Sequence, residues 1–139
     1  MNKPLPQIVC LCGSTRFYEA FVRANYEETM AGRIVLSVGF FMHSPGVHGQ
    51  AFGCTPEQKV KLDELHLRKI DLADETYILN VNGYIGQSTQ RELAYTVFTH
   101  KKLRFLEADA GEEFMERNAH ELGAYATEFF KSGKEHRVK

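Results

Sequence analysis

The segment that decides the fold is Tyr77-Ile78-Leu79-Asn80-Val81, followed after one residue by Gly83-Tyr84-Ile85-Gly86-Gln87-Ser88-Thr89-Gln90-Arg91-Glu92. The first part is short, apolar and rich in strand-forming residues, and residues 93–98 continue with the spacing of an amphipathic helix. A buried strand, a glycine-containing loop and a helix in this order predict part of a parallel α/β sheet. Because ligands bind at the carboxyl ends of the strands in such sheets, Glu92 would face a ligand.

Glu92 also has a purely structural interpretation. The pattern Thr89-x-x-Glu92 fits a capping box, in which the two side chains satisfy each other's free backbone amides at a helix start. Capping and chemistry are equally compatible with this segment.

Strand and helix patterns alternate along the rest of the chain. Strands are predicted at residues 7–13, 33–38, 76–81 and 103–106, and helices after Ser14 (ending at Gly32), at 56–73, around Glu92 and at about 112–130. The predicted buried stripes are Phe17, Ala20, Phe21 and Ala24; then Leu62, His66, Ile70 and Ala73, widened by Leu65 and Leu72; then Met115, Ala119, Leu122, Tyr125, Ala126 and Phe129.

This order predicts the architecture. The connections between strands are too long for hairpins, so the sheet is expected to be parallel with helices on both faces. We predict an α/β, single-domain Rossmann-like or flavodoxin-like three-layer sandwich of four or five strands, with strand order 2-1-3-4. The domain would span residues 1–131, followed by a disordered polar tail at 132–139.

Composition narrows the partners. The chain has 139 residues, with 17 basic and 18 acidic side chains and a formal net charge of -1, which gives no general attraction to nucleic acid or anionic membranes. It contains no apolar run of about 20 residues, and its first residues lack the apolar core of a signal peptide. We therefore expect a cytoplasmic protein whose partner is a small molecule.

The three cysteines do not suggest a disulfide framework. Cys10 and Cys12 would share one face of the first strand as small buried hydrophobic residues. A metal site of Cys54, His43 and His48 is conceivable, but its spacing matches no standard ligand set, so we expect no metal. The sequence also lacks the usual nucleotide fingerprints, and we expect no cofactor.

Two further regions are candidates for binding. Gly13, Ser14 and Arg16 join the first strand to the first helix, where backbone amides and a guanidinium suit an anion; a plain turn with a surface arginine is the alternative. The connection at residues 40–55 is unusually long, which is typical of a binding loop or of a disordered one. His66 on its apolar stripe fits a hydrogen-bonded core histidine.

Together these motifs resemble the nucleoside 2-deoxyribosyltransferase superfamily, which includes the 2′-deoxynucleoside 5′-monophosphate N-glycosidases. The resemblance rests on Cys12-Gly13-Ser14-Thr15-Arg16, on a helix ending Ile70-Asp71-Leu72-Ala73-Asp74, on the apolar strand and on Arg91-Glu92-Leu93-Ala94, and it spans residues 7–106. It implies that Glu92 attacks the anomeric carbon of the sugar. It also implies that Gly13, Ser14 and Arg16 face the 5′-phosphate, and that a partner subunit completes each site.

The chain departs from the family at one position. Members usually carry an aspartate near the leaving base, and alignment through Ile70 and Ala73 puts His66 there. Histidine could protonate the base at neutral pH, or its presence could mean altered base specificity or lost activity.

The sequence thus predicts an enzyme that cleaves or transfers the N-glycosidic bond of a (deoxy)nucleoside or its 5′-monophosphate, assembled as a homodimer or higher homo-oligomer. Its rivals are a ribonucleotide phosphoribohydrolase, although the Pro-Gly-Gly-x-Gly-Thr-x-x-Glu loop of those enzymes is absent, and a non-catalytic nucleotide-binding module. The start of the helix is expected to keep Glu92 ionised. The predicted catalytic residues are Glu92 and His66, and the predicted substrate-binding residues are Gly13, Ser14, Arg16, Phe17, His43, Asn82, Tyr84, Gly86 and Ser88.

Overall fold

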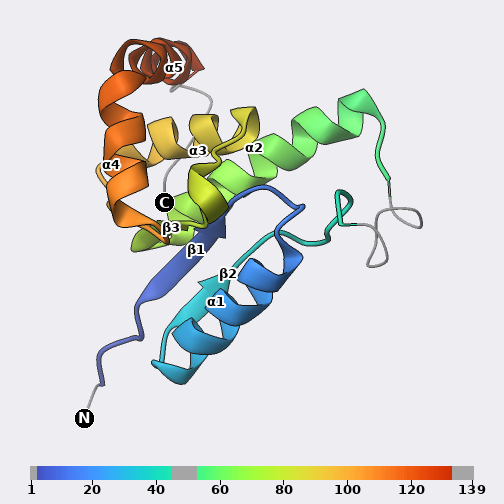
Figure 1. Cartoon of the computed structure of the whole chain (residues 1–139), viewed down its shortest axis with the longest axis vertical. Helices are drawn as coiled ribbons and strands as arrows, with labels where there is room; N and C mark the ends of the chain where they lie inside the picture. Colours follow the sequence, from blue (N-terminus) through green and yellow to red (C-terminus); the bar gives the residue numbers. More distant parts are fainter. Residues whose placement is uncertain (1–2, 45–52, 133–139) are drawn as a thin grey trace.

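The structure is a computed structural model, and it describes residues 3–44 and 53–132. All the predicted strands and helices are present in the predicted order (Figure 1). They are β1 (Ile8–Cys12), α1 (Tyr18–Met30), β2 (Ile34–Leu36), α2 (Pro56–Leu72), β3 (Glu75–Ile78), the short helix η1 (Val81–Gly83), α3 (Gln87–Phe98), β4 (Lys102–Phe105), α4 (Ala108–Arg117) and α5 (Ala119–Ser132).

The four strands form one parallel sheet in the order β2-β1-β3-β4, which confirms the predicted topology. After β1 the chain adds β2 on one side of it and then β3 on the other. The order of the strands therefore reverses at β1 and β3, and in open α/β sheets this is where ligands bind.

Helices cover both faces of the sheet because the side chains of β1 alternate between two cores. Val9 and Leu11 pack with Phe21 of α1, whereas Cys10 and Cys12 pack in the core that includes residues of α2, α3 and α5. Figure 1 shows α1 apart from the group formed by α2, α3, α4 and α5. The predicted three-layer sandwich is confirmed.

Several local predictions were wrong. Helix α1 begins after Phe17, not at Ser14, because the chain first makes a turn in which the Phe17 amide donates to the Ser14 carbonyl. Leu65 and Leu72 are 52% and 64% exposed, so the buried stripe of α2 is narrower than predicted. Strand β2 lies at the sheet edge, and its Ile34 is 45% exposed.

The predicted final helix is two helices. It starts earlier, at Ala108, and is interrupted at Asn118, whose side-chain amide donates to the Phe114 carbonyl at 2.9 Å. Ala119 therefore begins α5 on the exposed side. The last two helices carry four large aromatic side chains that could pack against a second subunit. Phe129 is instead buried against Tyr95 and Phe98, and Phe114 and Tyr125 pack on the same core, so these three need no second subunit. Phe130, 78% exposed, is the exception, and the oligomeric state stays a prediction.

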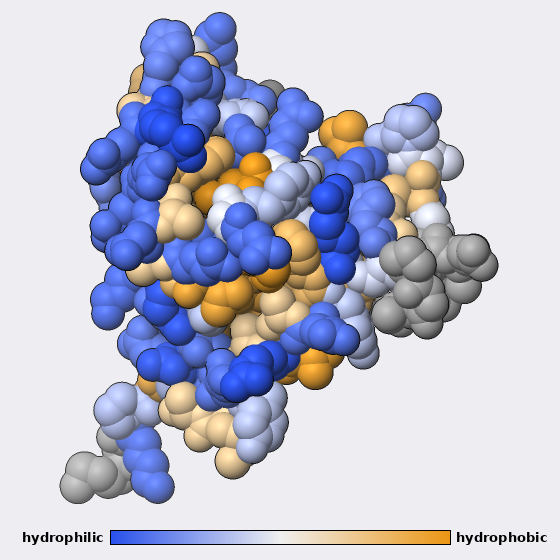
Figure 2. All heavy atoms as spheres, in the orientation of Figure 1, coloured by the Kyte–Doolittle hydropathy of each residue, from blue (hydrophilic) through white to orange (hydrophobic). Residues whose placement is uncertain are grey.

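Figure 2 shows apolar side chains reaching the surface across the middle of one face, with hydrophilic residues around them. None of the described helices is long and apolar enough to cross a membrane. The predicted tail begins one residue too early, because Ser132 is the last residue of α5. Residues 133–139 and residues 45–52 of the 40–55 loop, including His48, lie outside the described residues. The predicted Cys54, His43 and His48 metal site therefore remains a hypothesis.

Candidate functional site

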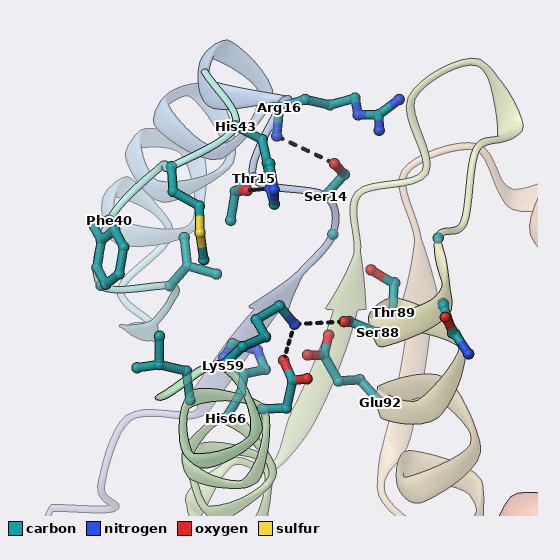
Figure 3. Close-up of a pocket in the computed structure, with 18 of the residues that line it drawn as sticks. Ser14, Thr15, Arg16, Phe40, His43, Lys59, His66, Ser88, Thr89 and Glu92 are labelled. Atoms are coloured by element: carbon teal, nitrogen blue, oxygen red, sulfur yellow. Dashed lines mark hydrogen bonds and ion pairs between the residues drawn. The ribbon is translucent and has the colours of Figure 1, made fainter. Parts of the chain in front are cut away.

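A cavity of about 290 Å³ opens at the carboxyl ends of the strands, between the segments that follow β1, β2 and β3 and beside the start of α3. This volume suits a small ligand. The cavity lies where the strand order reverses, as the fold predicts. Figure 3 shows its walls: the turn after β1, the segment after β2, one side of α2 and the first turns of α3. Seven of the nine predicted substrate-binding residues line it together with Glu92 and His66, and they are Gly13, Ser14, Arg16, His43, Tyr84, Gly86 and Ser88.

Glu92 projects from the second turn of α3 into this cavity (Figure 3). It is only 8% exposed. The capping interpretation was wrong, because the N-cap of α3 is Gly86 and Thr89 is a buried residue inside the helix. The capping box in the described chain lies elsewhere, where Thr55 and Gln58 exchange hydrogen bonds at the start of α2.

Burial controls the charge of Glu92. It raises the pKa of the carboxyl to about 7, although the nearby His66 opposes the rise. The idea that the helix start keeps Glu92 fully ionised was therefore wrong: the carboxyl lies beyond the first turn, where the helix dipole is weak, and desolvation dominates. No residue in the described ranges forms an ion pair with it.

His66 lies at the base of the cavity and is 6% exposed. Its Nε2 atom is 3.3 Å from the Cys12 sulfur and 3.6 Å from the Cys10 sulfur. Burial by itself would lower the pKa of His66, but the Glu92 charge and the contact with Cys10 outweigh it and raise the pKa to about 9. The two cysteines are thus polar partners of a histidine, which the prediction of inert buried thiols did not anticipate.

The turn after β1 is arranged differently from a simple helix cap. The Arg16 amide donates to Ser14 Oγ at 3.3 Å, and the Arg16 guanidinium lies 4.7 Å from the centre of the Tyr84 ring. Thr15 Oγ1 and His43 Nδ1 are 2.6 Å apart and tie the turn to the segment after β2. Gly13 packs tightly, since a Cβ there would lie 3.2 Å from the Leu79 carbonyl oxygen and would press on that backbone.

Two predicted binding residues do not line the cavity. Phe17 packs edge-on against the ring of Tyr84, which does line the cavity, with ring centres 5.9 Å apart. Asn82 has a left-handed backbone (φ 54°), and its amide donates to the Glu107 carboxylate at 2.6 Å. The left-handed turn at Asn82 directs it toward Glu107 at the start of α4, away from the cavity.

The sequence interpretation missed Lys59 and Asp63, which also line the cavity. The Lys59 ammonium donates to the Asp63 carboxylate and, at 3.0 Å, to Ser88 Oγ of α3 (Figure 3). Lys59, Asp63 and His66 are spaced four and three residues apart, so they share one face of α2. This helical spacing could have predicted from the sequence that Lys59 and Asp63 lie on the same side of the helix as His66.

Comparisons of the chain with protein-family models, with curated proteins and with solved structures find no match.

Proposed function

We propose that the protein cleaves or transfers the N-glycosidic bond of a (deoxy)nucleoside or its 5′-monophosphate, with Glu92 as the nucleophile. The observation that carries this proposal is a buried carboxyl without a cationic ion-pair partner among the described residues, aimed into a cavity at the switch point of the sheet. Such a costly arrangement is typical of a functional site.

The chemistry proceeds in two steps. A Glu92 carboxylate oxygen attacks the anomeric carbon as the bond to the base breaks, giving a glycosyl ester. Water or a second base then displaces the carboxylate from the opposite side, so the configuration is retained overall. A pKa of about 7 leaves roughly half of the Glu92 carboxyls ionised at neutral pH, ready to attack.

The departing base needs a proton. His66 has its Nε2 directed at two sulfurs, which suits a positioning residue whose positive charge offsets Glu92. Asp63 is more exposed, lies one turn earlier on α2 and is bonded to Lys59. We therefore assign base protonation to the Lys59–Asp63 pair, and 5′-end recognition to Ser14 and Arg16.

The test is a substrate panel. The protein is incubated with deoxyribo- and ribonucleosides and their 5′-monophosphates, with and without a second free base, and released base is followed by chromatography. Base release supports a hydrolase, and exchange supports a transferase. Release from ribonucleotides alone would favour the phosphoribohydrolase alternative.

A binding measurement completes the panel. Calorimetric binding of a nucleotide with no base released on long incubation would identify a binding module and overturn the catalytic proposal. The matched control is the Glu92→Gln variant, which keeps the shape of the side chain but lacks the attacking oxygen anion.

A further inference from the structure

Three potential metal ligands converge beneath the cavity. Cys10 and Cys12 are two residues apart on β1, so their side chains lie on the same face of the strand. His66 reaches them from α2, and the two sulfurs and the histidine nitrogen all lie within 4.8 Å of one another. In the described part of the chain this is the single cluster of its kind.

The distances match a tetrahedral site. An ion bound about 2.3 Å from sulfur and about 2.0–2.1 Å from nitrogen would separate the two ligand atoms by about 3.6 Å. The two sulfur-to-Nε2 distances are 3.3 and 3.6 Å. The ligand atoms thus already stand near the corners of a coordination tetrahedron.

We propose that Cys10, Cys12 and His66 bind a thiophilic divalent cation of the Zn²⁺ class, with the Glu92 carboxylate as the fourth ligand. The Glu92 carboxylate lies close enough for its charge to raise the pKa of both Cys12 and His66, and rotation of its side chain would bring it to the open corner of the site. Two thiolates, an imidazole and a carboxylate are all established zinc ligands.

The surroundings fit this assignment. All four side chains are at most 8% exposed and come from packed elements, which preorganises the ligands. His66 and Glu92 line the cavity, which supplies an entry path for the ion. The Lys69 ammonium, fixed to the Ser37 carbonyl at 2.7 Å, contributes positive charge beside Cys10 and offsets the excess negative charge of the ligands.

The test uses the full-length, reduced and chelator-treated protein titrated with Co²⁺. We expect one equivalent to produce thiolate-to-cobalt charge-transfer bands and the visible bands of tetrahedral cobalt, and Zn²⁺ to abolish both. Zinc-edge X-ray absorption of the wild-type protein should then show two sulfur neighbours at about 2.3 Å and two lighter ones at about 2.0–2.1 Å. A wild type without charge-transfer bands at excess Co²⁺ would overturn the site.

The variants identify the ligands. Cys10→Ala and Cys12→Ala should lose the charge-transfer intensity, His66→Asn should bind at least tenfold more weakly, and Cys54→Ala, the matched control, should behave as wild type. Zn²⁺ should raise the melting temperature of wild type and of Cys54→Ala but not that of Cys12→Ala. Bands that vanish in Cys54→Ala, or persist in the Cys10 and Cys12 variants, refute the assignment. Unchanged binding by Glu92→Gln would remove Glu92 from the ligand set.

One consequence rests on the proposed function. A Glu92 carboxylate bound to an ion cannot attack a sugar, so one equivalent of Zn²⁺ should suppress base release and a chelator should restore it. Full turnover by the zinc-loaded protein would refute Glu92 as the fourth ligand. The cobalt spectra need no turnover, so failure of the glycosidase proposal and failure of the metal site are distinguishable.

Discussion

Glu28 and Glu92 are both helical glutamates buried against the same sheet, at 6% and 8% exposure, yet their surroundings are opposite. Glu28 of α1 accepts hydrogen bonds from Arg104 at 2.6 and 3.2 Å and from Arg33 at 3.3 Å. Glu92 of α3 forms no ion pair with an arginine or lysine within the described ranges; the cation that acts on it is His66, and it faces a cavity.

Glu28 therefore stabilises the fold through ion pairs, whereas Glu92 does not. Arg104 also bonds Glu75 at 3.1 Å and lies 3.9 Å from the centre of the Tyr77 ring, so it joins α1, β3 and β4 in one network. Burying Glu92 without a strong partner costs stability, and proteins retain such groups mainly where they are used. We therefore expect changes at Glu28 to affect stability and changes at Glu92 to affect chemistry.

The largest expected effect comes from exchanging the two carboxyls for amides one at a time. Glu92→Gln removes the proposed nucleophile and should lower base release by roughly a thousandfold or more, while nucleotide binding persists. Glu28→Gln should leave turnover within about threefold of wild type in the folded protein, because it is remote from the cavity. Chromatographic rates and melting curves measure both. Activity of Glu92→Gln within tenfold of wild type would refute Glu92 as the nucleophile and show that its role is structural.

The position of Glu92 could be predicted from sequence, but its surroundings could not. Alternating strand and helix patterns, long crossovers and handedness were sufficient for the strand order and for placing Glu92 at the carboxyl ends of the strands. The capping error arose because Thr89-x-x-Glu92 satisfies the local rule, whereas the helix begins three residues earlier at Gly86.

The pairings that distinguish the two regions are long-range. Arg104 lies 76 residues from Glu28, and Cys10 lies 56 residues from His66. Periodicity predicts which face each residue occupies but not which polar groups meet across packed elements. Only the three-dimensional arrangement turns two buried thiols and a histidine into a cluster.

The second prediction concerns the stability of the Glu28 region. Arg104→Ala leaves Glu28 buried with Arg33 as its remaining cation and removes the bond to Glu75, so we expect a loss of about 2 kcal/mol in the free energy of unfolding. Urea denaturation measures this loss. Arg104→Lys should recover only part of it, because a lysine cannot make the forked bonds. A loss below about 0.5 kcal/mol would show that the network is not what stabilises this region.

The surroundings of Arg16 and Arg104 differ in the same way as those of Glu92 and Glu28. Arg16, like Arg104, lies over a tyrosine ring, but its guanidinium has no carboxylate partner in the described part of the chain and borders the cavity. Arg16→Ala should therefore change the melting temperature little and lower turnover of 5′-monophosphates about tenfold more than that of nucleosides. Steady-state kinetics on both substrates measure the ratio. Equal losses on both would contradict phosphate recognition by Arg16.

The smallest expected effect is in the pH dependence of stability, which only the Glu92 region should control. The pKa of Glu92 rises from its ordinary 4.5 to about 7 in the folded protein, because burial disfavours its charge. The folded state thus binds the Glu92 proton more tightly than the unfolded state, and stability falls as pH rises from about 4.5 to 7. His66 acts in the same direction: its contribution is complete below pH 6.5 and is lost as pH rises through about 9.

Cys10 acts in the opposite direction, because Cys12 and His66 lower its pKa to about 5 and its contribution to stability therefore grows as pH rises from 5 to 9. For the metal-free protein we therefore expect Glu92→Gln to make the slope of melting temperature against pH more positive than that of wild type between pH 5 and pH 7, because it removes the falling contribution of Glu92 and the negative charge that raises the pKa of His66. Glu28→Gln should lower the melting temperature at every pH measured, because it weakens the ion pairs with Arg104 and Arg33. Calorimetric scans at each pH measure the slopes, and a Glu92→Gln slope equal to that of wild type would show that the two buried carboxyls do not differ in the way their surroundings indicate.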